Sequence, residues 1–267
     1  MASIGVGDVT LHYEEAGAGE PVLLIPGTGA RGRTFWLHQV PALNAAGYRA
    51  ITLDNRGAGL SGPAGPGLEV GDLVADAVAV VEQVAGGPCR LIGTSLGAYV
   101  VQELLVTRPD LASQAVLMAG RARPDAVSLA LAAAYQAVAA EGVALNPRYD
   151  AINRALQNLS PATLQNPQVA QDWLDILEMS PTDVSDSARG QLEVVVDTDR
   201  RRAYGAITVP TLVISFADDL VAPPARGEEL ARAIPGARFV EIADTGHYGY
   251  LERPEAVNDE ILRFFTR

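Results

Sequence analysis

The sequence predicts an α/β protein built on a doubly wound, mostly parallel sheet, and two observations support this prediction. Short apolar runs alternate with stretches of helical spacing over residues 1–120, and the same alternation returns over residues 205–267. Such a rhythm is typical of parallel strands connected by crossover helices. Residues 121–204 instead carry several helical patterns, separated by prolines, and no convincing strand. We therefore expect a core domain formed by residues 1–120 and 205–267, with a helical insertion at residues 121–204 as a candidate lid.

Each expected element rests on the spacing of its apolar residues. Short apolar runs that end in Gly, Pro or polar residues indicate strands, and apolar residues three or four positions apart indicate helices. The expected strands are Ile4–Val6, Val9–Tyr13, Val22–Ile25, Tyr48–Leu53, Cys89–Gly93, Gln114–Met118, Thr211–Phe216 and Ala237–Ile242. The expected helices of the core are Thr34–Ala46, Leu68–Ala85, Leu96–Thr107, Ala225–Ile234 and Pro254–Phe265. Those of the insertion are Ala126–Glu141, Arg148–Leu159, Val169–Met179 and Ser187–Asp197.

Composition and charge exclude several classes of function. The chain has a formal net charge of -12, which disfavours binding to nucleic acid and to anionic membranes. No run approaches the roughly 20 apolar residues that cross a bilayer. The first residues lack the basic start and apolar stretch of a signal peptide. We therefore expect a cytoplasmic protein that acts on a small-molecule substrate, with no nucleic-acid and no membrane partner.

The residue types that could carry chemistry are few. Cys89 is the single cysteine, so an internal disulfide and a Cys-rich metal site are excluded. The chain contains no lysine, which excludes catalysis by a Schiff-base or general-base lysine. Its three histidines are His12, His38 and His247, so the search for a general base is short. The sequence implies no metal and no organic cofactor.

A nucleophile motif follows the strand expected at Cys89–Gly93. A nucleophile at a sharp strand-to-helix turn adopts an unfavourable backbone conformation, and side chains two residues before and after it would collide, so glycine occupies both positions. Ser95 meets these conditions and would stand at a helix N-terminus, where N–H groups favour a developing oxyanion. Ser61 lacks the second glycine and is typical of a surface loop. The motif, which fits Gly-x-Ser-x-Gly, lies in Leu91-Ile92-Gly93-Thr94-Ser95-Leu96-Gly97-Ala98.

A base and an acid complete the candidate constellation. A serine needs an adjacent base, and His247 is the histidine that follows both the nucleophile and the last expected strand. His12 lies within an N-terminal strand and His38 within a helix, so both are interpreted as structural. A carboxylate after the preceding strand would hold the imidazole tautomer, and Asp218 and Asp219 both lie there. The alternation of the strand does not choose between them.

These residues together resemble the α/β-hydrolase superfamily, in particular its small bacterial lid-bearing serine esterases, lactonases and cofactor-free haloperoxidases. The resemblance spans nearly the whole chain and implies an eight-stranded sheet. In such families the acid commonly lies four residues before a proline. This register maps onto Asp219, with Pro223 following, and leaves Asp218 as the alternative. Further marks of the resemblance are Ile25-Pro26-Gly27-Thr28, Asp54-Asn55-Arg56-Gly57-Ala58-Gly59-Leu60-Ser61, Gly246-His247 and Leu251-Glu252-Arg253-Pro254-Glu255.

The resemblance also implies an oxyanion hole made of two backbone N–H groups. One belongs to Leu96, directly after the nucleophile, and the other to Thr28, after the glycine of a His-Gly pair. Here Pro26 replaces the usual histidine. Donation from Thr28 should survive, because the missing side chain does not supply the N–H group. Asp54 and Arg56 are interpreted as a structural ion pair and turn element.

The predicted function is hydrolysis of a carboxylic ester, lactone or thioester through an acyl-enzyme formed on Ser95. The same triad would also serve a carbon–carbon bond hydrolase or a cofactor-free haloperoxidase acting by perhydrolysis. A second alternative is a hydrolase-like small-molecule receptor with little turnover. Tyr135, Tyr149, Trp173 and Met179 in the insertion suggest a small, fairly apolar substrate, although such residues are more often core residues than ligand contacts.

Overall fold

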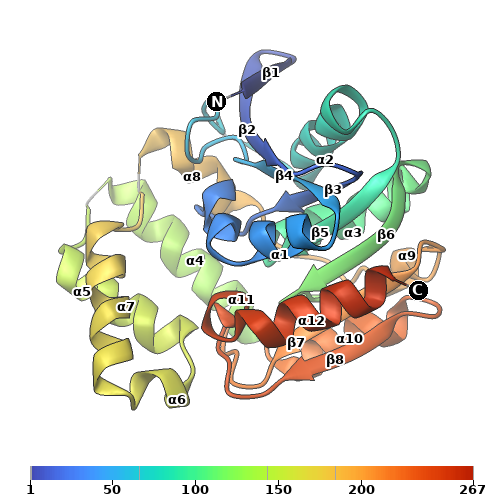
Figure 1. Ribbon diagram of the computed structural model, residues 1–267. Helices are drawn as coiled ribbons and strands as arrows, with labels where there is room; N and C mark the ends of the chain where they lie inside the picture. The colour runs from blue at the N-terminus through green and yellow to red at the C-terminus, as the bar shows by residue number, and fades with distance from the viewer. Residues whose placement is uncertain (1, 66, 143, 184, 267) are drawn as a thin grey trace.

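The computed structural model describes residues 2–65, 67–142, 144–183 and 185–266, and their strands form one eight-stranded sheet (Figure 1). The strands lie in the order β1-β2-β4-β3-β5-β6-β7-β8. β2 pairs antiparallel with β1 and with β4, and all other neighbours are parallel. The prediction of a doubly wound, mostly parallel sheet is therefore confirmed. The strands are β1 Ala2–Val6, β2 Val9–Ala16, β3 Glu20–Ile25, β4 Tyr48–Leu53, β5 Cys89–Thr94, β6 Ala112–Met118, β7 Thr211–Phe216 and β8 Arg238–Ile242.

Helices cover both faces of this sheet, and the alternate side chains of β3 show how. Leu23 and Ile25 belong to a core shared with α2, α3 and α10, whereas Val22 and Leu24 belong to a second core with α1 and α12. In Figure 1, α1 and α12 lie in front of the sheet and α3 lies behind it. Burial on both faces explains why the parallel strands are continuous apolar runs. These helices are α1 Gln39–Ala45, α2 Val70–Val80, α3 Leu96–Thr107, α10 Pro224–Ala233, α11 Gly249–Glu252 and α12 Pro254–Phe265.

One expected helix, Thr34–Ala46, is divided in the structure. A 3-10 helix, η1 (Gly32–Leu37), is followed by α1, and His38 between them has φ -139° and ψ -51°. Pro41 explains the break, because a continuous helix would need its missing N–H group to bond the carbonyl of Leu37. With the start of α1 at Gln39, Pro41 falls in the first turn, where no N–H donor is required.

The other core elements that were expected agree with the structure to within a few residues at their ends, whereas the short helix α11 was not expected. The expected helix Leu68–Ala85 is α2 followed by η2 (Val81–Ala85), a π turn that stops at Gly86 with φ +85°. A short 3-10 helix, η3 (Pro109–Leu111), precedes β6. Among the described residues, no helix combines the length and the apolar character needed to cross a membrane.

Helices α4 to α9 lie between β6 and β7 in the chain, and α4 to α8 occupy the left-hand side of Figure 1, whereas α9 lies on the right. Part of this insertion has a small core of its own, in which Ala155 and Leu159 pack with Leu177. Two short helices, α6 and α9, were not expected, and α8 is shorter than the expected Ser187–Asp197. That the insertion works as a lid stays a prediction. Its helices are α4 Ala126–Glu141, α5 Pro147–Asn158, α6 Pro161–Leu164, α7 Pro167–Met179, α8 Asp186–Glu193 and α9 Arg201–Tyr204.

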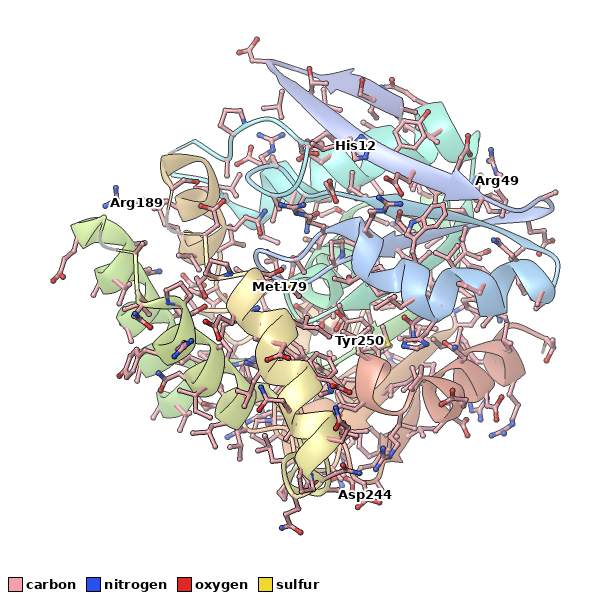
Figure 2. All side chains as sticks on the ribbon, turned by 60° about the vertical axis from the view of Figure 1, so that its left-hand side comes forward. His12, Arg49, Met179, Arg189, Asp244 and Tyr250 are labelled. Carbon is pink, nitrogen blue, oxygen red and sulfur yellow. The ribbon has the colours of Figure 1, made fainter. Side chains whose placement is uncertain are left out.

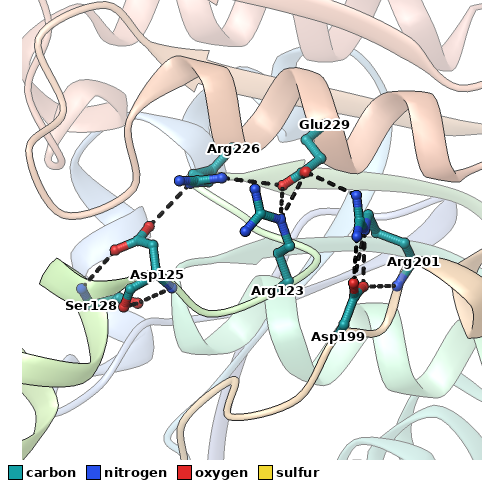
Figure 3. A network of polar contacts seen from close by, with 7 residues as sticks. All are labelled: Arg123, Asp125, Ser128, Asp199, Arg201, Arg226 and Glu229. Atoms are coloured by element: carbon teal, nitrogen blue, oxygen red, sulfur yellow. Dashed lines mark hydrogen bonds and ion pairs between the residues drawn. The ribbon is translucent and has the colours of Figure 1, made fainter.

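A network of ion pairs ties both ends of the insertion to α10 (Figure 3). Glu229 on α10 accepts hydrogen bonds from Arg123, at 2.8 Å, and from Arg201, at 3.3 Å. Arg226, one turn earlier on the same helix, bonds Asp125 at 3.1 Å. Arg123 and Asp125 precede α4, while Arg201 begins α9. The two ends of the insertion are therefore anchored to the same core helix.

Candidate active site

Ser95 lies at the junction between β5 and α3 in a strained backbone conformation. Its φ of 53° and ψ of -114° are rare for a residue with a side chain. The surrounding structure holds it there, since its N–H donates to the carbonyl of Met118 at 3.0 Å. A serine that starts a helix usually caps it with its hydroxyl, but Ser95 makes no such bond. The hydroxyl group is therefore left available at the N-terminus of α3.

The two glycines of the motif are explained by close backbone approaches. A Cβ atom on Gly93 would lie 2.3 Å from the carbonyl oxygen of Gly97. A Cβ atom on Gly97 would lie 2.0 Å from the carbonyl oxygen of Ile25, at the end of β3. Gly93 is thus required by the turn itself, whereas Gly97 is required by the neighbouring strand. Any larger residue at either position would displace the backbone that carries Ser95.

His247 and Asp219 meet in the loops that follow β8 and β7. His247 Nδ1 lies 2.8 Å from Asp219 Oδ2, and both side chains are almost completely buried. The other carboxylate oxygen accepts the N–H groups of Val221 and Ala222, at 2.8 and 2.7 Å. Asp218, one residue earlier, is held by its backbone N–H to the carbonyl of Thr245. The structure therefore places Asp219 and not Asp218 against the imidazole.

The surroundings of Asp219 fix its charge and hence the tautomer of the histidine. Burial raises the pKa of the Asp219 carboxyl, but the charge of His247, its hydrogen bond and two backbone N–H groups outweigh this effect and lower the pKa overall. An ionised carboxylate only accepts hydrogen bonds, so His247 Nδ1 carries the proton. Whenever Nε2 is unprotonated, it can accept a proton from a nucleophile.

The nucleophile and this pair occupy the same edge of the sheet. β5, β6, β7 and β8 are parallel neighbours, so the loops after their carboxyl ends lie along one edge. Among the described residues, Ser95 Oγ has no hydrogen-bond partner within 3.5 Å, so Ser95 and His247 are not bonded to each other in this state. Catalytic hydrogen bonds often tighten only when substrate is bound. The edge thus carries Ser95, Asp219 and His247, the three residues that the sequence singles out.

The loop after β3 lies against the nucleophile. A Cβ atom on Gly27 would lie 3.2 Å from Ser95 Cβ, so the backbone of the loop contacts the serine directly. Thr28 follows at the exposed surface of this loop, and Leu96 lies buried at the start of α3. These are the positions that the resemblance to α/β hydrolases implies for the two donors of an oxyanion hole, which stays a prediction.

Comparison with known proteins places this arrangement in a family. The model of the Alpha/beta hydrolase family matches residues 22–260, a stretch that includes Ser95, Asp219 and His247. The chain belongs to the α/β-hydrolase family. The resemblance seen in the sequence is therefore confirmed, and the protein is an enzyme of this family.

Individual relatives of this α/β hydrolase carry several names. The chain is 45% identical over 258 residues, 97% of its length and 98% of the relative, to "Putative non-heme bromoperoxidase BpoC" of Mycobacterium tuberculosis (strain ATCC 25618 / H37Rv). The crystal structure of that protein covers 96% of this chain and 95% of its own, with a TM-score of 0.92. "Putative carbamate hydrolase RutD" of Variovorax paradoxus (strain S110) is 31% identical over 263 residues, 96% of each chain. The enol-lactonase from Burkholderia xenovorans LB400 is 25% identical, with a TM-score of 0.85 over 100% of both chains.

The insertion of this hydrolase contacts the loop that carries His247. The carbonyl of Asn158, at the end of α5, accepts the N–H of Tyr248 at 3.0 Å. Glu252 bonds the N–H of Gly246 with one carboxylate oxygen, at 2.6 Å, and Ser160 of the insertion with the other. The ring of Tyr248 also stacks on Trp173 of α7, with centroids 6.1 Å apart. The position of the base therefore depends on helices of the insertion.

The interpretation of Asp54 and Arg56 as an ion pair with each other is wrong. Arg56 pairs instead with Asp76 of α2, through two hydrogen bonds of 2.7 and 2.5 Å. The Asp54 carboxylate accepts the N–H groups of Gly32 and Leu60. Backbone donors satisfy Asp54, and a buried carboxylate on the neighbouring helix satisfies the guanidinium. Both residues nevertheless hold loops in place, as expected.

The apolar residues singled out in the insertion are placed differently from one another. Trp173 is half-buried against Tyr248, whereas Met179, at the end of the same helix, is 77% exposed (Figure 2). Tyr149 is also exposed, and Tyr135 bonds Gln157 through its hydroxyl group. Of these residues, Trp173 therefore contacts the loop of the candidate site.

Metal-ligating groups and surface hollows are the other features of the described part of the chain that could mark a ligand site. Within it, no group of three or more His, Cys, Asp or Glu side chains is placed to hold a metal ion. A surface hollow of about 430 Å³ over α10 is lined by paired charges such as Arg226 and Glu229. None of its lining residues belongs to the loops that carry Ser95, Asp219 or His247.

Proposed function

We propose that this enzyme is a serine hydrolase that cleaves a carboxylic ester, lactone or thioester of a small, fairly apolar substrate. The observation that carries the proposal is the pairing of His247 Nδ1 with the buried Asp219 carboxylate, on the same edge of the sheet as an uncapped serine hydroxyl. A buried imidazole with a fixed tautomer on the same edge as an available hydroxyl is the arrangement that acyl transfer needs.

In the proposed reaction, Ser95 Oγ attacks the carbonyl carbon while His247 Nε2 takes the hydroxyl proton. The N–H groups of Leu96 and Thr28 stabilise the oxyanion of the tetrahedral intermediate. When the intermediate collapses, His247 gives the proton to the leaving oxygen or sulfur and Ser95 keeps the acyl group. Water then repeats both steps and releases the acid. Asp219 stays ionised throughout and stabilises the imidazolium.

A second candidate activity is favoured by the 45% identity to the relative named a non-heme bromoperoxidase. If hydrogen peroxide replaces water in the second step, the acyl-enzyme yields a peracid and free Ser95. The peracid can oxidise bromide to hypobromite, and the carboxylic acid is regenerated. This route uses the same nucleophile, so it is an additional outcome of the proposed acyl-enzyme. Carbon–carbon bond hydrolysis is the further alternative that a substrate panel must include.

The test combines labelling with turnover. Wild-type protein should react with a fluorophosphonate at Ser95 and should hydrolyse p-nitrophenyl esters. Ser95→Ala should lose both properties while its circular dichroism and melting temperature stay near the wild-type values. Because the triad works as a unit, adding His247→Ala to Ser95→Ala should cost little more. Labelling at Ser61 or at another residue would refute the assignment.

The alternatives are separated by substrate and by rate. Bromination in the presence of acetate, peroxide and bromide would show perhydrolysis, and cleavage of a β-diketone would show carbon–carbon hydrolysis. A hydrolase-like receptor would instead bind its ligand saturably and release it faster than it turns it over. Such behaviour, together with absent fluorophosphonate labelling, would contradict the proposed function.

A further inference from the structure

The loop beside Ser95 forms a tight turn with Thr28 in its middle. The N–H of Ala30 donates to the carbonyl of Gly27 at 3.2 Å, which closes the turn. Gly29 occupies the third position with φ +68°, a conformation that glycine adopts without strain. Asn55 holds the start of the loop by donating to the carbonyl of Pro26 at 3.1 Å.

A side chain of the insertion holds the other end of this turn. Gln191, on α8, accepts the N–H of Gly29 on Oε1 at 2.8 Å. Its Nε2 donates to the carbonyl of Arg56 at 2.6 Å, and the side chain is only 1% exposed. These bonds join segments 162 and 135 residues apart. Arg56 is fixed in turn by Asp76 on α2, so the amide of Gln191 bridges the loop to the core.

The two peptide planes around Thr28 are therefore both fixed. A peptide unit is planar and trans, so its C=O and N–H groups point in opposite directions. Because the carbonyl of Gly27 points at Ala30 inside the turn, the N–H of Thr28 points outward. Among the described residues this N–H has no hydrogen-bond acceptor. The next plane, which carries the N–H of Gly29, is set by Gln191. Without that bond, rotation about the backbone bonds of Thr28 and Gly29 would be restrained only by the hydrogen bond from Ala30 to Gly27.

We propose that Gln191 is a positioning residue for the oxyanion hole, through which the insertion sets the direction of the Thr28 N–H group. This inference rests on the proposed function, because it assumes that an oxyanion forms at Ser95. Gln191 touches neither substrate nor Ser95 and acts only through the Gly27–Ala30 turn. The hole is complete only while α8 lies against the core, so displacement of α8 loosens one of its two donors.

The close packing of α8 makes this coupling direct. A Cβ atom on Gly190 would lie 2.5 Å from the carbonyl oxygen of Gly65, so the helix rests on the backbone of the core loop. Glu193, two residues after Gln191, accepts the N–H of Gly67 at 3.0 Å. The residues before and after Gln191 in α8 therefore both contact the loop of the core. These contacts restrict where the amide of Gln191 can lie.

The test uses Gln191→Met, which keeps the length of the side chain and removes both hydrogen bonds. We expect kcat for an ester to fall about 10- to 100-fold while KM stays within about twofold, since the hole acts on the transition state. The rate of fluorophosphonate labelling at Ser95 should fall by a similar factor, because the phosphoryl oxygen also occupies the hole. Gln191→Asn, which is too short to reach both partners, should show an intermediate loss and serves if the methionine variant does not fold.

The matched control is Gln136→Met. Gln136 also bonds α8, donating to the carbonyl of Leu192 at 2.9 Å, but it does not contact the turn. Both methionine variants should lower the melting temperature by a few degrees, and only Gln191→Met should lower kcat. Equal kcat losses in the two variants, or a raised KM with unchanged kcat, would refute the inference. Wild-type protein that neither labels nor hydrolyses esters would refute the proposed function itself, and this inference with it.

Discussion

The loops that carry Ser95 and His247 are held in different ways. Ser95 is fixed by backbone groups of the sheet: its N–H bonds Met118 on the next strand, and Gly97 behind it contacts Ile25. The loop of His247 is held in large part by the insertion, through Asn158 and through Ser160, which shares Glu252 with that loop. Ser95 is therefore held by the core, whereas the loop of His247 is held in large part by the insertion.

This difference indicates which loops of the candidate site can change position. Main-chain packing leaves little freedom, because a shift of Ser95 would break its hydrogen bond to Met118 and disturb the contact of Gly97 with Ile25. Side-chain contacts with the insertion can be exchanged without disturbing the sheet. Gln191 of the insertion also accepts a hydrogen bond from the Gly27–Ala30 turn. On the proposed mechanism, the core would fix the position of Ser95, and the insertion would set the alignment of His247 and of the Thr28 N–H group.

The strongest test of the comparison is Asp219→Asn. Asparagine keeps the shape of the side chain but removes the acceptor that sets the tautomer of His247, so we expect kcat/KM to fall by as much as ~10⁴ with Ser95 unmoved. The matched control is Asp218→Asn, which should cost less than about tenfold, because the Asp218 carboxylate does not bond the imidazole. Measuring kcat/KM for both variants on one ester decides the matter. A larger loss at Asp218 would move the acid to that residue.

The same substitution should change how the free energy of unfolding depends on pH. The pKa of Asp219 is lowered in the folded protein, so its ionised form adds stability above the ordinary pKa of an aspartate. That stability is lost as the pH falls through the lowered, folded-state pKa. Asp219→Asn lacks this contribution, so the difference in unfolding free energy between wild type and variant should shrink on acidification. Chemical denaturation at neutral and at acidic pH measures it.

Much of the fold and part of the site followed from the sequence because their signals are local. Strand ends, the glycines around Ser95 and the position of His247 after the last strand can all be recognised within a few residues. The break before α1 also had a local cause in Pro41, although it was not foreseen. Gln191 carries no local signal, since its role depends on how α8 packs against a loop more than a hundred residues earlier. Tertiary packing decides such contacts.

A smaller effect is expected from Glu252→Gln, which weakens the tie between the insertion and the loop of His247. Glu252 accepts the N–H groups of Ser160 and Gly246, and a glutamine would direct an NH₂ group at one of these donors. We expect kcat to fall about tenfold, in line with one lost buried hydrogen bond and a slightly misplaced base. Glu255→Gln, on the exposed side of α12, is the control and should change neither kcat nor the melting temperature. Equal, wild-type activity in both variants would show that the base is positioned by the core alone.

The smallest expected effect concerns selectivity and comes from two residues on α7. Trp173 stacks on Tyr248 beside the base, whereas Met179 is 77% exposed at the end of the same helix. Trp173→Ala should remove the ring that packs on Tyr248, the chain neighbour of His247, and raise the relative kcat/KM for longer acyl esters by a few fold, a change of about 1 kcal/mol in transition-state binding. Met179→Ala should leave the ranking of acetyl to decanoyl esters unchanged. Kinetics on this ester series, with melting temperatures of both variants, provide the measurement. If Trp173→Ala lowers only the melting temperature and keeps the wild-type ranking, Trp173 is a packing residue, and the insertion controls alignment of the site without shaping the acyl pocket.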